Sequence, residues 1–196
     1  MLYTNYMNPI DQLVKICPKY DILLEKNKSN NHFIITFKLE NQNYDLIQLT
    51  DYSFFKMMAD INKDILQELR LDTDNVCDQN DSEKVNMYFL FNPIAEDFGI
   101  LKKCMSIQTN KQIGDNCIIF KSKNLDHIPN DMMKYDKVNC HFSQLNIDIL
   151  NNHLLNVRYE FNIDIKEDLP IYMQNLIGLI MKKMFLKLKL FIENMK

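Results

Sequence analysis

The stretch YEFNIDIKEDLPIYMQNLIGLIMKKMFLKLKLFIENMK, residues 159–196, predicts a strand that runs almost directly into a long helix. Apolar and polar side chains alternate over residues 153–165, which is typical of a half-buried strand. Pro170 suits the first turn of a helix, and Asp168 is placed to cap it. We therefore expect a helix that runs to about Asn194.

Apolar residues recur along this helix at intervals of three and four, which predicts one face packed against the rest of the protein. These residues are Met173, Leu176, Ile177, Ile180, Met184, Leu188, Phe191 and Met195. Four lysines interrupt the helix and argue against a membrane-spanning segment. They read most simply as a solvated face, and contact with anionic head groups at a membrane surface is the alternative for Lys182, Lys183 and Lys187.

The rest of the chain supplies more strands and two helices. A short helix is expected over 9–16 and an amphipathic helix, or a bent pair, over 51–71. A change of parity near Ser143 predicts a β-bulge. Strand-like alternation marks residues 20–26, 32–40, 44–49, 84–91, 97–109, 116–123 and 137–150. This order predicts an α+β fold, with one domain over 1–196 and one curved antiparallel sheet wrapped around the long C-terminal helix.

Composition narrows the class of protein. The 196 residues are 46% hydrophobic and 25% charged, which is ordinary for a globular chain, and the net charge of −3 gives no basic field that would attract nucleic acid. The five cysteines are scattered and suit reduced, packed thiols in the cytosol better than disulfides or a zinc site. No signal peptide is recognisable at the start. Abundant Asn, Lys and Ile are typical of an AT-rich genome, such as that of a protist or a large DNA virus.

Motifs for catalysis or cofactor binding are absent from the sequence. It has no glycine-rich phosphate loop, no G-x-S-x-G and no H-E-x-x-H. His141 and His153 flank a predicted hairpin and could face each other, but two surface histidines are expected more often than a metal pair. The sequence therefore predicts no enzyme, cofactor or metal.

Three stretches resemble the START domain, a lipid-transfer family with a helix-grip fold. FFKMMADINKDILQEL (54–69) is similar to the helices between the third and fourth strands of the family, and 85–107 to a strand, Pro, Asp-Phe and strand pattern. Residues 135–192 resemble the last hairpin and closing helix of the phosphatidylcholine-transfer-protein branch. The chain departs from the pattern at Glu96, where the family usually has Arg, and at Tyr172, which replaces Trp.

This resemblance implies an internal cavity that holds one lipid, a phospholipid or a sterol, and carries it between membranes as a cytoplasmic monomer. The closing helix would act as a lid, and a membrane surface would be a transient partner. Inward-facing residues expected to line the cavity are Phe33, Phe37, Met87, Phe89, Phe91, Tyr159, Phe161, Met173, Ile177, Ile180, Met184 and Phe191.

The residue pattern itself leaves two interpretations open. The same side chains could line a mostly apolar pocket, or they could simply pack together as a filled core. In the second case the chain would be a non-enzymatic interaction or structural module. A catalytic pocket is least favoured, because no acid and base groups converge in the pattern.

Overall fold

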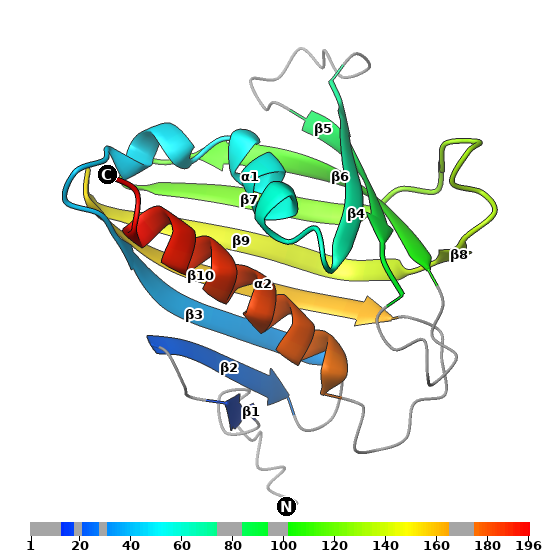
Figure 1. Ribbon diagram of the computed structural model, residues 1–196, viewed down its shortest axis with the longest axis horizontal. Helices are drawn as coiled ribbons and strands as arrows, with labels where there is room; N and C mark the ends of the chain where they lie inside the picture. Colours follow the sequence, from blue (N-terminus) through cyan, green and yellow to red (C-terminus); the bar gives the residue numbers. More distant parts are fainter. Residues whose placement is uncertain (1–12, 18–20, 28–30, 74–83, 94–101, 165–174) are drawn as a thin grey trace, which may run out of the picture.

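A computed structural model describes residues 13–17, 21–27, 31–73, 84–93, 102–164 and 175–196 of the chain. Within these residues, ten strands form one sheet, and two α-helices lie together on its concave face (Figure 1). The predicted fold class, a curved antiparallel sheet with a long C-terminal helix, is confirmed.

The sheet has the order β1-β2-β3-β10-β9-β7-β6-β5-β4, and β8 pairs with β6. Every pairing is antiparallel except that between β6 and β8. The last strand therefore lies in the middle of the sheet, between β3 and β9. The strands are β1 (Leu13–Cys17), β2 (Ile22–Asn27), β3 (His32–Glu40), β4 (Leu66–Asp72), β5 (Lys84–Phe91), β6 (Lys103–Ile113), β7 (Cys117–Asn124), β8 (Asp136–Lys137), β9 (Asn139–Asn151) and β10 (Leu154–Asp164).

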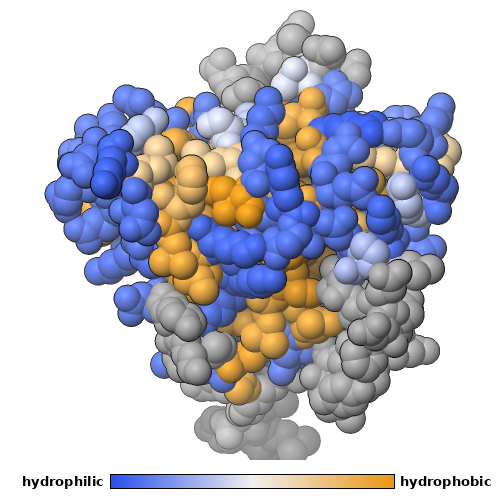
Figure 2. All heavy atoms as spheres, viewed as in Figure 1, coloured by the Kyte–Doolittle hydropathy of each residue, from blue (hydrophilic) through white to orange (hydrophobic). Residues whose placement is uncertain are grey.

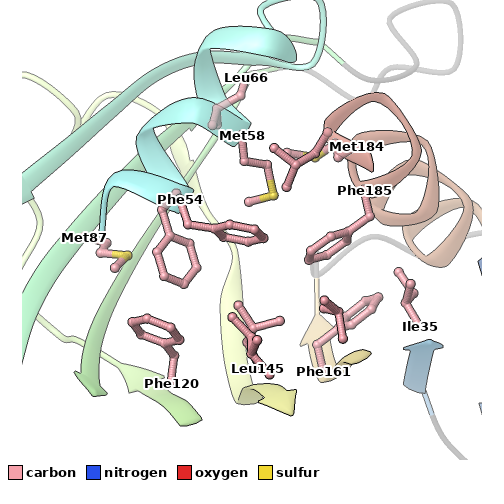
Figure 3. Close-up of a cluster of buried hydrophobic side chains, with 14 of the residues drawn as sticks. Ile35, Phe54, Met58, Leu66, Met87, Phe120, Leu145, Phe161, Met184 and Phe185 are labelled. Atoms are coloured by element: carbon pink, nitrogen blue, oxygen red, sulfur yellow. The ribbon is translucent and has the colours of Figure 1, made fainter. Parts of the chain in front are cut away.

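The helices α1 (Ser53–Ile61) and α2 (Leu176–Glu193) contact each other above the sheet. Helix α2 crosses β2 and β3, whereas α1 contacts β4 (Figure 1). Gly178 lets the first turns of α2 approach β3 closely, since a Cβ atom there would lie 2.5 Å from Cδ1 of Phe33. Side chains from both helices and from the sheet then meet in one core (Figure 3).

A second, smaller core lies on the opposite, convex face of the sheet. Tyr88 and Leu90 of β5 and Cys104 of β6 are buried there beneath Met132, which belongs to the segment between β7 and β8. Arg70 on β4 fixes that segment by hydrogen bonds to Asp131. The segment therefore covers the face of the sheet that points away from the helices.

Two predictions near the N-terminus are wrong. The described part of the helix expected over 9–16 belongs to β1, which pairs with β2, so strand pairing outweighs the helix-start signal at Pro9. The strand expected over 44–49 is a 3₁₀ helix, η3 (Leu46–Leu49). Its start is set by Asp45, whose carboxylate accepts a hydrogen bond of 3.0 Å from the Ile47 N–H.

The helix expected over 51–71 is correct only in its first half. It ends at Ile61, and Asn62 follows it, donating from Nδ2 to the Met58 carbonyl at 2.8 Å. After a turn the chain enters β4. Leu69 keeps a helical spacing from Ile65, but the sheet overrides that weak signal with a strand that pairs along β5.

The bulge predicted near Ser143 is two residues earlier. The register of β9 with β10 shifts between Phe142 and Cys140, and His141 and Phe142 are both exposed. His141 therefore lies at the start of β9, whereas His153 lies in the turn after its end. The two histidines are at opposite ends of the hairpin and do not face each other.

Candidate functional site

An enclosed cavity of about 40 Å³ lies between the sheet and the two helices. Strands β5, β6, β7, β9 and β10 form its floor, and α1 and α2 form its roof (Figure 3). Its lining consists of Phe55, Met58, Phe89, Phe91, Met105, Ile107, Phe120, Ser122, Cys140, Ser143, Leu145, Tyr159, Ile163, Met181, Met184 and Phe185.

Two aromatic clusters form opposite sides of this cavity. On one side, the ring of Phe55 from α1 packs edge-on against Phe120, with 5.3 Å between centroids. On the other side, Tyr159 lies 5.1 Å from Phe185 of α2 and stacks on Phe161 at 5.0 Å. The cavity therefore lies between the aromatic cluster of α1 and that of α2.

Four methionines fill the space between the aromatic clusters: Met58 on α1, Met105 on β6, and Met181 and Met184 on α2. Unbranched thioether side chains have three rotatable bonds and repack at small cost. The walls contributed by the two helices are thus the most adaptable part of the lining.

The lining carries no charged side chain among the residues that the structure describes. Its polar groups are the hydroxyls of Ser122, Ser143 and Tyr159 and the thiol of Cys140. Burial raises the pKa of the Tyr159 phenol well above its usual range, with a smaller contribution from Cys140. Burial also raises the pKa of Cys140 to about 11. Both groups therefore stay protonated and neutral at physiological pH.

The predicted lining residues divide into three groups. Phe89, Phe91, Tyr159 and Met184 do line the cavity. The others within the described residues contribute to the packed core beside it, with one exception: Phe33, Phe37, Met87 and Phe161 are buried, and Ile177 and Ile180 are partly buried. The exception is Phe191, which is 48% exposed. Met173 lies outside the described residues.

Phe191 points outward because the buried face of α2 follows a different row of residues from the predicted one. The fully buried positions include Gly178, Phe185, Leu188 and Ile192. The predicted row is offset by about one residue and drifts towards solvent at the end of the helix. The inward row includes a glycine and two lysines, Gly178, Lys182 and Lys189. A search for regularly spaced apolar residues therefore does not detect this row.

Twelve lining residues were missed by the sequence analysis. Phe55 and Met58 belong to α1, which the pattern predicts as a helix without showing that it covers the same face as α2. Ser122, Cys140 and Ser143 are polar or small, so a search for large apolar residues passes over them. The alternation of β7 and β9 would have found Ser122 and Ser143 as inward-facing positions, whereas Cys140 faces inward only because of the bulge at His141.

Ion pairs on one side hold α2 in place. The Nζ atoms of Lys183 and Lys187 lie 2.9 Å and 2.6 Å from the two carboxylate oxygens of Asp64, which lies in the turn after α1. These two predicted membrane-contact lysines are thus partly exposed, and both are ion-paired with Asp64. Lys182 is only 5% exposed, so in this conformation its ammonium group does not reach a membrane surface.

The C-terminal end of α2 is attached to β3 and the turn that follows. Asn41 donates from Nδ2 to the carbonyls of Ile192 at 2.6 Å and Met195 at 3.0 Å. Lys189 donates to the Lys38 carbonyl at 2.8 Å, at the edge of β3. These bonds satisfy backbone groups that a helix end and a strand edge otherwise leave open.

A wider groove of about 1280 Å³ lies at the edge of β3 beside the end of α2, but it is open to solvent. Its walls carry both acidic and basic side chains, among them Asp148, Arg158 and Glu193. The enclosed cavity is the better candidate site because its walls are apolar and converge from five strands and two helices.

Metal and membrane-spanning sites were also sought in the described part of the chain. It contains no group of three or more His, Cys, Asp or Glu side chains that could bind a metal ion. Cys104, Cys117 and Cys140 are free thiols. Neither α1 nor α2 combines the length and apolarity needed to cross a bilayer.

Solved structures with a similar fold are lipid-transfer domains. Human StAR-related lipid transfer protein 5 matches with a TM-score of 0.70 at 10% identity, over 91% of this chain and 85% of that one. The lipid transfer and protein localization domain of human StarD13 matches with a TM-score of 0.72 at 10% identity, over 97% and 100%. A STAR-related lipid transfer protein from Xanthomonas axonopodis matches with 0.60 at 12%, over 93% and 99%.

The chain has the START helix-grip fold. No protein-family model matches its sequence, and no curated protein does. At 10 to 12% identity the likeness shows the fold alone, and it does not single out the phosphatidylcholine-transfer branch.

Proposed function

We propose that this protein binds a single lipid in the cavity between sheet and helices and carries it between membranes, without catalysis. The observation that carries the proposal is an enclosed, uncharged cavity roofed by α2, in a fold shared with lipid-transfer domains. Burial of an acyl chain in such a cavity is favourable by about 0.8 kcal/mol for each methylene. Release then needs an equally apolar acceptor, which a bilayer provides.

The cavity must widen before a lipid fits. Its volume of about 40 Å³ is close to that of one water molecule, whereas ligand sites usually measure roughly 300 to 1,000 Å³. The four lining methionines and the outward movement of α2 would supply the difference. The structure therefore corresponds to a closed state of the cavity in this proposal.

Opening is proposed to occur at a membrane, with α2 as the lid. Its outer face combines the exposed apolar side chains Leu179, Leu190 and Phe191 with the ion-paired Lys183 and Lys187. On the face of the molecule that carries the helices, apolar surface is interspersed with hydrophilic side chains (Figure 2). Such a mixture suits the boundary between head groups and acyl chains. Anionic head groups would compete with Asp64 for the two lysines.

The segment between β7 and β8 does not contribute to this gate. Its Met132 packs on the convex face, opposite to the cavity. The proposed gate therefore consists of α2 and its contacts with Asp64 and Asn41. A cytoplasmic location, a monomeric state and no contact with nucleic acid complete the proposal.

The alternative function is a non-enzymatic interaction or structural module with a filled core. The small cavity favours it, because most of the predicted lining residues already pack against one another. In that case the fold would be retained for its outer surface, and α2 would have no reason to open.

Native mass spectrometry of gently purified protein separates these functions. The proposal expects protein carrying the extra mass of one lipid, and vesicles with a labelled lipid should exchange it faster when protein is added. Bare protein that neither acquires lipid from vesicles nor accelerates exchange would exclude the carrier and favour the module.

A further inference from the structure

Four hydroxyl groups form a row on four neighbouring strands of the sheet; three of them line the cavity, and the fourth, that of Thr109, is hydrogen-bonded to one of these. The hydroxyl row consists of Thr109 on β6, Ser122 on β7, Ser143 on β9 and Tyr159 on β10. The register places Thr109 opposite Ser122, and Ser122 opposite Ser143. Oγ1 of Thr109 and Oγ of Ser122 are 2.9 Å apart, and Ser143 Oγ donates to the Tyr159 hydroxyl at 3.0 Å.

The hydroxyl row has more protons to donate than acceptors to receive them. Each hydrogen-bonded pair contains two hydroxyl protons and uses one of them between its members. Within the described residues, the Tyr159 proton has no acceptor once Ser143 has donated to the phenolic oxygen. The pair of Thr109 and Ser122 likewise keeps one proton. Both pairs are part-buried, and a donor that is largely removed from water without a partner is costly, so each pair favours an incoming oxygen acceptor.

Charge at the cavity limits what that acceptor can be. Among the residues that the structure describes, no cationic side chain lines the cavity. Lys103 lies on the same face of the sheet, next to Phe91, but its ammonium group is paired with Asp136 at 3.2 Å. A phosphate or carboxylate beside the hydroxyl row would therefore be buried without a counter-ion, which is strongly unfavourable. An uncharged oxygen has no such cost.

We infer that the hydroxyl row is the polar subsite of the cavity, and that it selects uncharged lipids with a hydroxyl or carbonyl oxygen over lipids with a phosphate or carboxylate head group. This inference rests on the proposed function, since it concerns the ligand of the same cavity. The raised pKa of Tyr159 agrees with it, because the phenol stays a hydrogen-bond donor at physiological pH.

Three probes that share one alkyl chain test this selectivity: hexadecane, 1-hexadecanol and hexadecyl phosphate. Each is offered to the intact protein in phosphatidylcholine vesicles, the protein is recovered by gel filtration, and the bound probe is quantified by mass spectrometry. We expect hexadecanol to bind about tenfold better than hexadecane, which equals about 1.4 kcal/mol. Hexadecyl phosphate should bind more weakly than either.

Variants of the hydroxyl row locate the selectivity. Tyr159→Phe keeps the ring and removes the hydroxyl, and Ser143→Ala removes its partner. Both should reduce the ratio of bound hexadecanol to bound hexadecane several-fold. Tyr88→Phe is the matched control, since it removes a buried phenol from the convex face and should change nothing. Circular dichroism verifies that each variant is folded.

The outcomes separate this inference from the proposed function. If neither a probe nor phosphatidylcholine binds, the lipid-carrier function itself fails. If the three probes bind equally, or if Tyr159→Phe keeps the full preference for the alcohol, only the polar subsite is refuted. Tight binding of hexadecyl phosphate, or recovery of the protein with phosphatidylcholine from the vesicles, would overturn the selection for uncharged lipids.

Discussion

Lys187 of α2 is bound to Asp64, with 2.6 Å between Nζ and Oδ1, and this pair joins the middle of the last helix to the turn that follows α1. Lys183, one turn earlier, binds the other oxygen of the same carboxylate. The hydrogen bonds from Lys187 and, next, from Lys183 are the main causes that lower the pKa of Asp64 to about 2. One acidic side chain thus holds both of the lysines that an anionic membrane would attract.

Asp64→Asn should make α2 easier to displace. Exposed ion pairs contribute only about 0.2 to 1 kcal/mol each, so loss of the two pairs, about 0.4 to 2 kcal/mol together, should raise vesicle-to-vesicle lipid exchange by about two- to thirtyfold. Asp60→Asn is the control, because Asp60 pairs only with Lys63 on the surface, at 3.8 Å. Equal exchange rates for the wild type and Asp64→Asn would show that this ion pair does not restrain the lid.

The same ion pairs should give the protein a defined response to acid. Because the pKa of Asp64 is lowered from 3.8 to about 2, its contribution to stability is complete above about pH 4 and disappears as the pH falls through 2. The difference in free energy of unfolding between wild type and Asp64→Asn should therefore be constant from pH 7 to about pH 4 and shrink below it. Urea titrations at several pH values measure this, and a difference unchanged at pH 2 would contradict it.

Substitution of Asn41 should lower the free energy of unfolding more than substitution of most other polar residues. Its amide donates to Ile192 and Met195, and its oxygen accepts from the backbone N–H groups of Asn43 at 2.8 Å and Tyr44 at 3.1 Å. Asn41→Ala leaves these buried groups unpaired and should lower the free energy of unfolding by about 2 to 3 kcal/mol. Gln42→Ala, at an exposed neighbour, should cost less than about 0.5 kcal/mol. Similar losses for both variants would argue against a specific anchor.

Gly178→Ala should destabilise the protein although alanine favours helices. The new methyl group would overlap the ring of Phe33, which is fully buried and stacked on Phe161 at 5.3 Å. Overpacking costs about 1 to 3 kcal/mol, which exceeds the gain in helix propensity of up to about 1 kcal/mol. Thermal unfolding monitored by circular dichroism should show a lower Tm, whereas a higher Tm would mean that α2 can shift away from β3.

Cys140 offers a direct measure of opening. Its thiol is buried in the cavity wall and has its pKa raised to about 11, so at pH 8 it should react with N-ethylmaleimide at least about tenfold more slowly than the partly exposed Cys117. Vesicles with anionic lipid should accelerate labelling of Cys140 but not of Cys104, which is buried on the convex face. Peptide mass spectrometry reads each site separately. Unchanged labelling of Cys140 with vesicles would exclude movement of α2.

The fold was predictable from the sequence because its long strands alternate cleanly. In β10, Leu155, Val157 and Phe161 are buried, as the pattern predicts. The failures occur where two signals compete, as at Asn62, whose side chain binds the Met58 carbonyl within an apparently continuous helical pattern. Short apolar runs carry too little periodicity to settle such a competition.

The cavity was less predictable than the fold. Apolar periodicity indicates which side chains face inward, and Phe161 and Met184 both do so, yet only Met184 lines the space. Whether an inward side chain contacts a neighbour or lines a cavity depends on how the helices pack against the sheet. This packing leaves no periodic pattern in the sequence. The polar members of the lining, such as Ser143, are invisible to a count of apolar residues.

The position of β10 also bears on how the protein is made. The first three strands end in an edge at β3 that pairs with β10, and more than a hundred residues of chain separate β3 from β10. Contacts between segments so far apart in the sequence form slowly. During translation, the backbone groups on this edge of β3 therefore stay unpaired until β10 is made. An exposed strand edge can pair with other chains and so promotes aggregation. The edge of β3 is therefore exposed to such contacts until β10 has been synthesised.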